Sequence, residues 1–182
     1  KRQVLESVES PVNTRQQFGE NKITTFQNDG KDTCRYEDDY IDIIWQVGEN
    51  HFFLAMRNKT KHIIKINWDE ACCVDYNGMT GRVSHQGTKF TDRYEPQGIS
   101  AIPAGATLCD IIIPTDNISY NKRSGWGSKS LIPCKKGNSI ESVDLASSFI
   151  GKKISVILPI IIENVQNEYT FTFNVVDFWN NF

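Results

Sequence analysis

The sequence lacks most of the features that identify a function at sight. It has no run of about 18 apolar residues, the length of a membrane span, and its longest apolar stretch, Ile154 to Ile162, is interrupted by a proline. Its 20 basic and 22 acidic residues give a formal net charge of −2, so neither nucleic acid nor an anionic lipid surface is favoured as a partner. It contains no G-x-S-x-G, no H-E-x-x-H and no glycine-rich phosphate loop. We therefore expect no cofactor, no metal and no catalytic residue from motifs.

Cysteine and histidine are too scattered to form a recognisable motif. The odd number of cysteines, without any C-x-x-C pair, leaves at least one thiol unpaired in the monomer; they are Cys34, Cys72, Cys73, Cys109 and Cys134. Cys72 and Cys73 are adjacent and could form a vicinal disulfide. Alternatively, one thiol points inward and the other outward, because successive strand residues point to opposite faces. The histidines lie in three separate segments; they are His51, His62 and His85. Either the pairing of strands brings two of them together as metal ligands, or each is an isolated residue of a strand.

What the sequence does contain is alternation of apolar and polar residues. In Tyr40 to Val47 every second residue is apolar, and His62 to Trp68 repeats that period of two. The apolar run His51 to Arg57 lies between them, with short turns on both sides. These three segments predict a meander of three antiparallel strands.

A second set of strands follows. Asn77-Gly78 lies between the strand-like runs Cys72 to Tyr76 and Thr80 to His85, which predicts a hairpin. The residues Asp69 to Ala71 break the alternation and predict a bulge or a step between sheets. The run Leu108 to Ile113 predicts a strand that ends at Pro114.

The C-terminal third gives the clearest pattern. Lys152 to Ile162 and Glu168 to Asp177 alternate throughout and predict a hairpin, joined by a five-residue connection. Pro159 within the first strand predicts an edge position or a bulge. A helical stripe in Ser139 to Phe149 predicts one short helix. The residues expected to line the core are Trp45, Ile64, Ile66, Trp68, Val156, Leu158, Phe171 and Phe173.

Together these patterns predict an all-β fold, an antiparallel β-sandwich with long loops and at most one or two short helices. Residues 1–22 are expected to be a tether or an irregular segment, because their pattern is polar and mixed. Residues 23–182 are expected to form a single domain, opening with an edge strand at Ile23 to Gln27.

An acidic cluster precedes the first strong strand; it consists of Glu37, Asp38, Asp39 and Asp42. Several carboxylates together suit a calcium ion. The sequence lacks the D-x-D-x-D-G loop, however, and charges beside a strand also serve as a solvated edge that prevents association. The sequence leaves both readings open.

The segment Asp116 to Lys129 is the least regular and is expected to be an exposed loop. It carries the candidate ligand-binding residues Trp126, Tyr120, Arg123 and Lys122. The indole lies between two glycines, and an exposed tryptophan offers a large apolar face to a sugar ring or a protein. The alternative is that Trp126 folds back and caps the end of the sandwich.

From Phe53 to Val176 the order of motifs resembles a group of uncharacterised extracytoplasmic lipoproteins of Gram-negative gut-type bacteria. The motifs are I-x-I-x-W-D-E-A, V-D-Y-N-G, R-V-S-H-Q-G, I-P-A-G and the ending ISVILPIIIENVQNEYTFTFNVV. The resemblance implies an immunoglobulin-like sandwich, held outside the cytoplasm by a lipid on an N-terminal cysteine. That cysteine is not in this sequence, and the group brings no catalytic residues.

These observations favour a non-enzymatic binding or surface-assembly module in the periplasm or on the outer membrane. Its expected partner is a cell-surface protein or glycan, with the membrane contacted only through the lipid anchor. The chain starts at Lys1 without methionine, which is expected either after removal of a leader or after trimming of the domain. The alternative function is a glycan-active hydrolase, whose carboxylates converge only in the fold.

Overall fold

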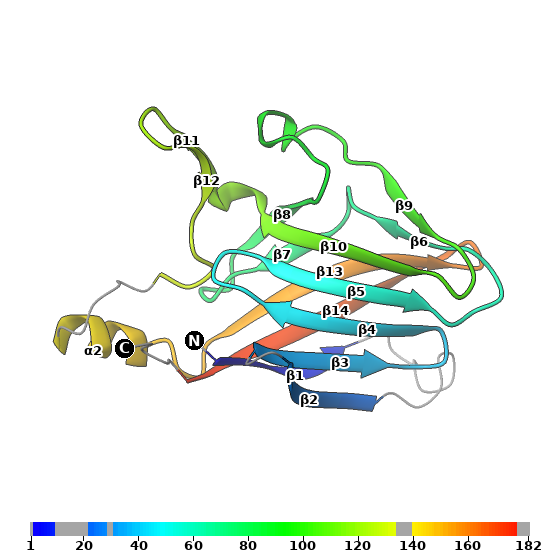
Figure 1. The fold of residues 1–182 in the computed structure, drawn as a ribbon, viewed down its shortest axis with the longest axis horizontal. Helices are drawn as coiled ribbons and strands as arrows, with labels where there is room; N and C mark the ends of the chain where they lie inside the picture. Colours follow the sequence, from blue (N-terminus) through cyan, green and yellow to red (C-terminus); the bar gives the residue numbers. More distant parts are fainter. Residues whose placement is uncertain (1, 10–21, 29–30, 134–139, 178–182) are drawn as a thin grey trace.

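The computed structural model describes residues 2–9, 22–28, 31–133 and 140–177, which form an all-β fold of antiparallel strands (Figure 1). In this part of the chain the only α-helix is α2 (Ile140–Ser147), which confirms the short helix expected there. None of the described helices has the length and apolar character needed to cross a bilayer. Apart from one separate two-stranded hairpin, the described strands are arranged in two layers, joined by one strand that belongs to both.

One layer is built around a meander of four consecutive strands. They are β2 (Lys22–Asn28), β3 (Lys31–Glu37), β4 (Ile41–Val47) and β5 (Phe52–Asn58). The long strand β10 (Thr107–Pro114) pairs with β5 on its other side, and β8 (Thr80–His85) pairs with β10.

The other layer is built around the C-terminal hairpin. Its strands are β13 (Lys153–Ile162) and β14 (Val165–Asp177), and β1 (Arg2–Glu9) pairs with β14 at the edge. On the other side of β13 lie β6 (Ile64–Asn67) and β7 (Cys72–Val74), and β9 (Ile99–Ile102) pairs with β6.

Strand β8 changes layer halfway along its length. Its first half, Thr80 to Arg82, pairs with β7, whereas its second half, Val83 to His85, pairs with β10. The hydrogen-bonded sheet is therefore continuous around this corner, as in sandwiches whose corner strands switch sheets. The hairpin expected at Asn77-Gly78 is confirmed, with Gly78 at a positive φ of 82°.

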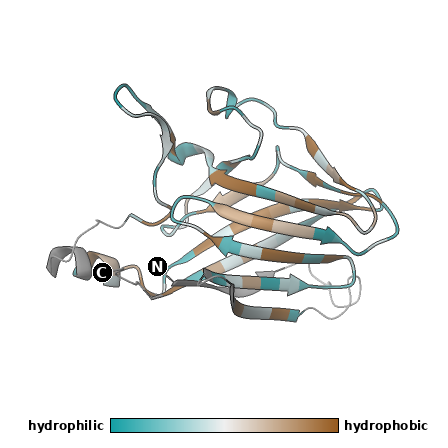
Figure 2. Cartoon of the chain, in the orientation of Figure 1, coloured by the Kyte–Doolittle hydropathy of each residue, from teal (hydrophilic) through white to brown (hydrophobic). Residues whose placement is uncertain are grey.

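The core lies between the layers. The Trp45 ring from β4 packs against Phe171 and Phe173 from β14, with ring centroids 5.0 and 5.6 Å apart. All eight residues expected to line the core are buried, which confirms the inward faces assigned from the alternation. Figure 2 shows the hydrophobic residues concentrated along the strands, while the connections are mainly hydrophilic.

Two expectations about strands are wrong. Residues Arg2 to Glu9 are a paired strand rather than an irregular tether, because β14 offers them an open edge; residues 10–21 lie outside the described part. The run His62 to Trp68 does not complete a meander with the two runs before it, since β6 crosses to the other layer. Instead β3, which the charged sequence concealed, joins β4 and β5.

The crossing from β5 to β6 is held by Asn58, a buried side chain. Its amide nitrogen donates to the carbonyl oxygens of His62 and Ile102, at 2.7 and 2.9 Å. Its amide oxygen accepts from the backbone N–H of Thr60 at 2.8 Å. These bonds replace the strand ladder that ends at this point.

Pro159 is neither on an edge strand nor in a bulge of its own strand. It pairs in register with Glu168 of β14, while its other side faces the gap between β6 and β7. The residues Trp68 to Ala71 leave the ladder there, which confirms the break expected at Asp69 to Ala71. Proline is tolerated because no ladder N–H is needed opposite that break.

The C-terminal hairpin is confirmed, but its turn is tighter than expected. Ile162 pairs with Val165, so only Glu163 and Asn164 lie between the strands. Both have positive φ, of 50° and 66°. A two-residue turn with positive φ at both central positions is the type that matches strand twist.

Candidate functional site

The segment expected to be an exposed loop is mostly a second, two-stranded sheet. After the short 3-10 helix η2 (Thr115–Asn117), β11 (Ile118–Asn121) pairs with β12 (Gly125–Ser128). The hairpin projects from the layers at the upper left of Figure 1. Gly125 has a φ of 75°, a conformation that glycine adopts without strain, where the chain returns from the tip.

Tyr120 and Trp126 are directly opposite each other on this hairpin, with ring centroids 5.4 Å apart. Both are exposed, at 60% and 40% of their area. Phe90, from the 3-10 helix η1 (Phe90–Asp92), packs edge-on against Trp126 at 6.2 Å. Trp126 is therefore neither free in solvent nor inserted into the core, since neighbouring rings contact it while 40% of its area stays exposed.

Arg93 completes this cluster. Its guanidinium carbon lies 4.7 Å from the ring centroid of Tyr94 and 5.2 Å from that of Trp126, within cation–π range. Its Nη1 donates to the carbonyl oxygen of Phe90 at 2.8 Å. We call the group Phe90, Arg93, Tyr94, Tyr120 and Trp126 the aromatic surface.

The loop that carries η1 is fixed to the sandwich. Arg82 Nη1 on β8 donates to the carbonyl oxygen of Tyr94 at 2.8 Å. The Tyr94 hydroxyl donates to Asp116 Oδ1 at 3.1 Å, which ties the loop to η2 at the base of the hairpin. The exposed rings are thus held in place before any ligand arrives.

The four candidate residues are therefore divided by the structure. Tyr120 and Trp126 are in contact, whereas Lys122 and Arg123 lie exposed in the turn at the tip of the hairpin. The backbone N–H of Arg123 donates to Asn121 Oδ1, which shapes that turn. No pattern in the sequence pointed to Phe90, Arg93 and Tyr94, because they come from a separate loop that only the fold brings close.

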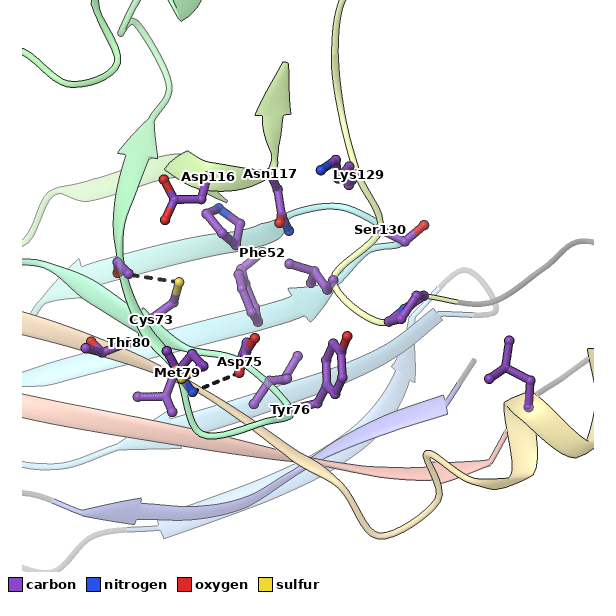
Figure 3. Close-up of a pocket in the computed structure, with 17 residues that line it drawn as sticks. Phe52, Cys73, Asp75, Tyr76, Met79, Thr80, Asp116, Asn117, Lys129 and Ser130 are labelled. Atoms are coloured by element: carbon purple, nitrogen blue, oxygen red, sulfur yellow. Dashed lines mark hydrogen bonds between the residues drawn. The ribbon is translucent and has the colours of Figure 1, made fainter.

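A cavity of about 650 Å³ lies at the base of the same hairpin (Figure 3). It is lined by the β7–β8 hairpin, the starts of β5 and β13, the end of β10, η2, the chain that leaves β12 and one side chain of α2. Its apolar lining includes Phe52, Leu131 and Ile154, which are buried. Its polar lining consists of Asp75, Thr80, Asp116, Asn117, Lys129 and Ser130.

The buried thiol of Cys73 also lines this cavity. It donates to the carbonyl oxygen of Gly81 at 3.6 Å. Burial, followed by the nearby Cys72, Asp75 and Asp116, raises the pKa of Cys73 to about 12. The thiol is therefore protonated at neutral pH and does not act as a nucleophile.

The acidic cluster does not gather around a cation site. Asp42 accepts two hydrogen bonds from the Arg35 guanidinium, at 2.7 and 2.8 Å. Glu37 forms ion pairs with Lys59 and Arg35, at 3.0 and 3.2 Å. No group of three or more metal-ligating side chains occurs among the described residues.

Asp38 of that cluster is buried, at 2% exposure, and joins the two layers. Its carboxylate accepts from the hydroxyls of Tyr36 and Tyr169 at 2.9 and 3.0 Å, and from the backbone N–H of Tyr40 and Ile41 at 2.8 Å each. Burial raises the pKa of Asp38, and the four hydrogen bonds oppose that rise. Asp38 is a structural residue rather than a ligand for a metal.

The three histidines remain apart. His51 Nδ1 lies 2.8 Å from Asn50 Oδ1, and His62 lies 3.9 Å from Glu163. His85 Nδ1 lies 3.0 Å from the buried carboxylate of Asp110, and its ring stacks on Trp68 at 4.4 Å. Within the described chain the histidines are therefore isolated from one another, but only His85 lies in a strand, whereas His51 and His62 lie in connections.

Cys72 and Cys73 are both free thiols, so the vicinal disulfide is absent. Cys73 is buried and Cys72 is half-buried, as expected for neighbours in a strand. Cys109 is exposed and free, Cys34 is buried, and Cys134 lies outside the described residues.

The comparisons with known proteins add no family: no family model, curated protein or solved structure matches the chain. The features of this chain that bear on function are therefore the aromatic surface and the cavity.

Proposed function

We propose that the protein is a non-enzymatic binding module, which contacts a cell-surface glycan or protein through the aromatic surface. The observation that carries this proposal is the packing of Trp126. Phe90 and Arg93 fix its ring while 40% of its area stays exposed. A rigid aromatic face that is ready before binding loses little conformational entropy when a ligand stacks on it.

Replacing Trp126 by alanine tests the proposal. Binding of the wild-type protein to cell-surface glycans is first measured on an array and then by titration of the best ligand. Trp126→Ala should weaken that binding by about 2 kcal/mol or more, the scale of a hot-spot residue. The melting temperature should change little, because the removed ring lies outside the core.

Phe26→Ala is the matched control, since Phe26 is exposed to a similar extent, 39%, on the distant strand β2. It should leave binding unchanged. Equal binding by wild type and Trp126→Ala, or an equal loss in the control variant, would contradict the contact surface.

The immunoglobulin-like form of the sandwich, the extracytoplasmic location and the lipid anchor belong to the same proposal. They are supported by the resemblance of Phe53 to Val176 to extracytoplasmic lipoproteins. Labelled palmitate supplied to the producing cells should be incorporated into the protein. Protease added to intact cells should cleave it if it lies on the outer surface, and should spare it if it lies in the periplasm.

The alternative function, a glycan-active hydrolase, finds one supporting observation. Asp75 and Asp116 come from distant segments and line the same cavity. Two carboxylates across a cleft are what glycoside hydrolysis requires. Release of reducing sugar from a polysaccharide, abolished by Asp116→Asn, would favour this function over the binding module.

A further inference from the structure

The cavity at the base of the hairpin differs in character from the aromatic surface, because it is concave and its interior is apolar. Phe52, Leu131 and Ile154 form its buried wall, and Val74 and Tyr76 continue it toward solvent. Its volume of about 650 Å³ falls within the range of small-molecule sites. The cavity is thus suited to the apolar body of a small molecule.

The charge of the cavity is negative. Asp75 and Asp116 line it, and Lys129 is the one cation among its described lining residues. Neither carboxylate forms an ion pair within the described part of the chain, although Lys129 shares the cavity with them. In the view of Figure 3, Asp116 lies above Phe52 and Asp75 lies below it, so acidic groups flank the apolar wall.

Each carboxylate uses only one of its oxygens in hydrogen bonds to described residues. Asp75 Oδ1 accepts from the backbone N–H groups of Asn77 and Met79, at 2.8 and 2.9 Å. Asp116 Oδ1 accepts from the Tyr94 hydroxyl at 3.1 Å. Both side chains are therefore held in place, and a second oxygen of each can accept from a ligand.

The chain leaves space beside the second oxygen of Asp116. A Cβ atom built on Gly81 would lie 3.5 Å from Asp116 Oδ2 and would meet no other atom within 4 Å. A ligand group can therefore approach this oxygen from the side of Gly81.

We propose that this cavity binds a small amphipathic cation, with its apolar body against Phe52, Leu131 and Ile154 and its protonated amine beside Asp75 and Asp116. Apolar contact supplies most of the affinity. The two carboxylates select for positive charge, because they have no cationic partner of their own in the described chain. This site is independent of the proposed function of the aromatic surface.

Three probes that differ only in their polar end test the inference. They are phenylbutylamine, phenylbutanol and phenylbutyrate, which are cationic, neutral and anionic at pH 7. Isothermal titration calorimetry with the full chain should rank their affinities in that order. We expect the amine to bind at least about tenfold more tightly than the carboxylate, since two partly solvated charge contacts change sign between them.

Two kinds of variant locate the site. Asp116→Asn and Asp75→Asn keep the hydrogen-bond acceptors that shape the loop but remove the charges. Each substitution should lower the affinity for the amine severalfold and leave the affinity for the alcohol unchanged. Gly81→Val should abolish binding of all three probes, because its side chain fills the space beside Asp116.

Gly127→Val is the matched control, since Gly127 lies in β12, does not line the cavity and has no atom within 4 Å of an added Cβ. It should bind the amine as the wild type does, and so should Trp126→Ala. The inference is overturned if none of the probes binds, if amine and carboxylate bind equally, or if a folded Gly81→Val variant retains the amine.

Discussion

Tyr169 donates one of the four hydrogen bonds that hold the buried Asp38 carboxylate between the layers. Because burial raises the pKa of Asp38 in the folded protein, its contribution to stability is present below its unfolded pKa of about 3.9 and is lost as pH rises through the folded value. The hydrogen bond from Tyr169 limits that loss, since it lowers the pKa of the carboxyl group.

Tyr169→Phe should therefore destabilise the protein more at neutral than at acidic pH. The variant raises the pKa of Asp38 further, so ionising the carboxyl group costs more. We expect a loss of about 1.5 to 3 kcal/mol at pH 7, the scale of a hydrogen bond to a charged group, and a clearly smaller loss below about pH 4. Urea unfolding at both pH values measures the difference, with the exposed Tyr94→Phe as control. An equal loss at both pH values would show that Asp38 does not titrate in this range.

Phe171 tests the inward face of β14. Its side chain is fully buried between Tyr36, Trp45 and Tyr169. Phe171→Ala should lower the free energy of unfolding by about 3 to 5 kcal/mol. The adjacent Thr170→Ala, on the opposite face, should cost less than about 1 kcal/mol. Comparable losses for the two variants would mean that the strand is turned over.

At the level of elements, the turn between β13 and β14 has a backbone conformation that its residues do not favour. Glu163 and Asn164 both have positive φ, which glycine and asparagine tolerate better than glutamate. The double substitution Glu163→Asn and Asn164→Gly should raise the free energy of unfolding by about 1 kcal/mol. Thermal melts measure the change. A loss of stability would mean that the side chain of Glu163 contributes more than its backbone strain costs.

The elements that could be predicted from the sequence are the strands in which apolar and polar residues alternate. Strands β4, β13 and β14 are examples, because one face of each is packed against the core. Strand β3 was missed because Arg35 and Glu37 on its outer face gave it the composition of a turn. Strand β1 was missed because it depends on pairing with β14, about 170 residues away in the chain.

The candidate site was predicted only in part for a similar reason. The glycines on both sides of Trp126 marked this segment as a candidate, and Tyr120 is the cross-strand partner of Trp126. Phe90 and Arg93, which fix the ring, lie in a polar connection without periodicity. The cavity was not predicted at all, because its walls come from segments far apart in the sequence that only the fold brings together.

At the level of the whole molecule, the shared packing of the two layers predicts a single unfolding transition. A single buried cluster contains residues of both layers, including Trp45, Trp68 and Phe171. Strand β8 connects the layers by hydrogen bonds. Unfolding in urea should therefore give the same midpoint by circular dichroism and by tryptophan fluorescence. Two separate midpoints would mean that the layers unfold independently.

The antiparallel pairing of β1 with β14 determines how the molecule responds to mechanical force. Arg2 lies opposite Asp177, so the described chain begins and ends at one point of the sheet, and Glu9 lies opposite Thr170 at the other end of the pair. Tension applied between residues 2 and 177 loads the pairs one after another and peels β1 away at low force. Tension applied between residues 9 and 177 loads all the pairs in shear and requires a higher force to separate the same two strands.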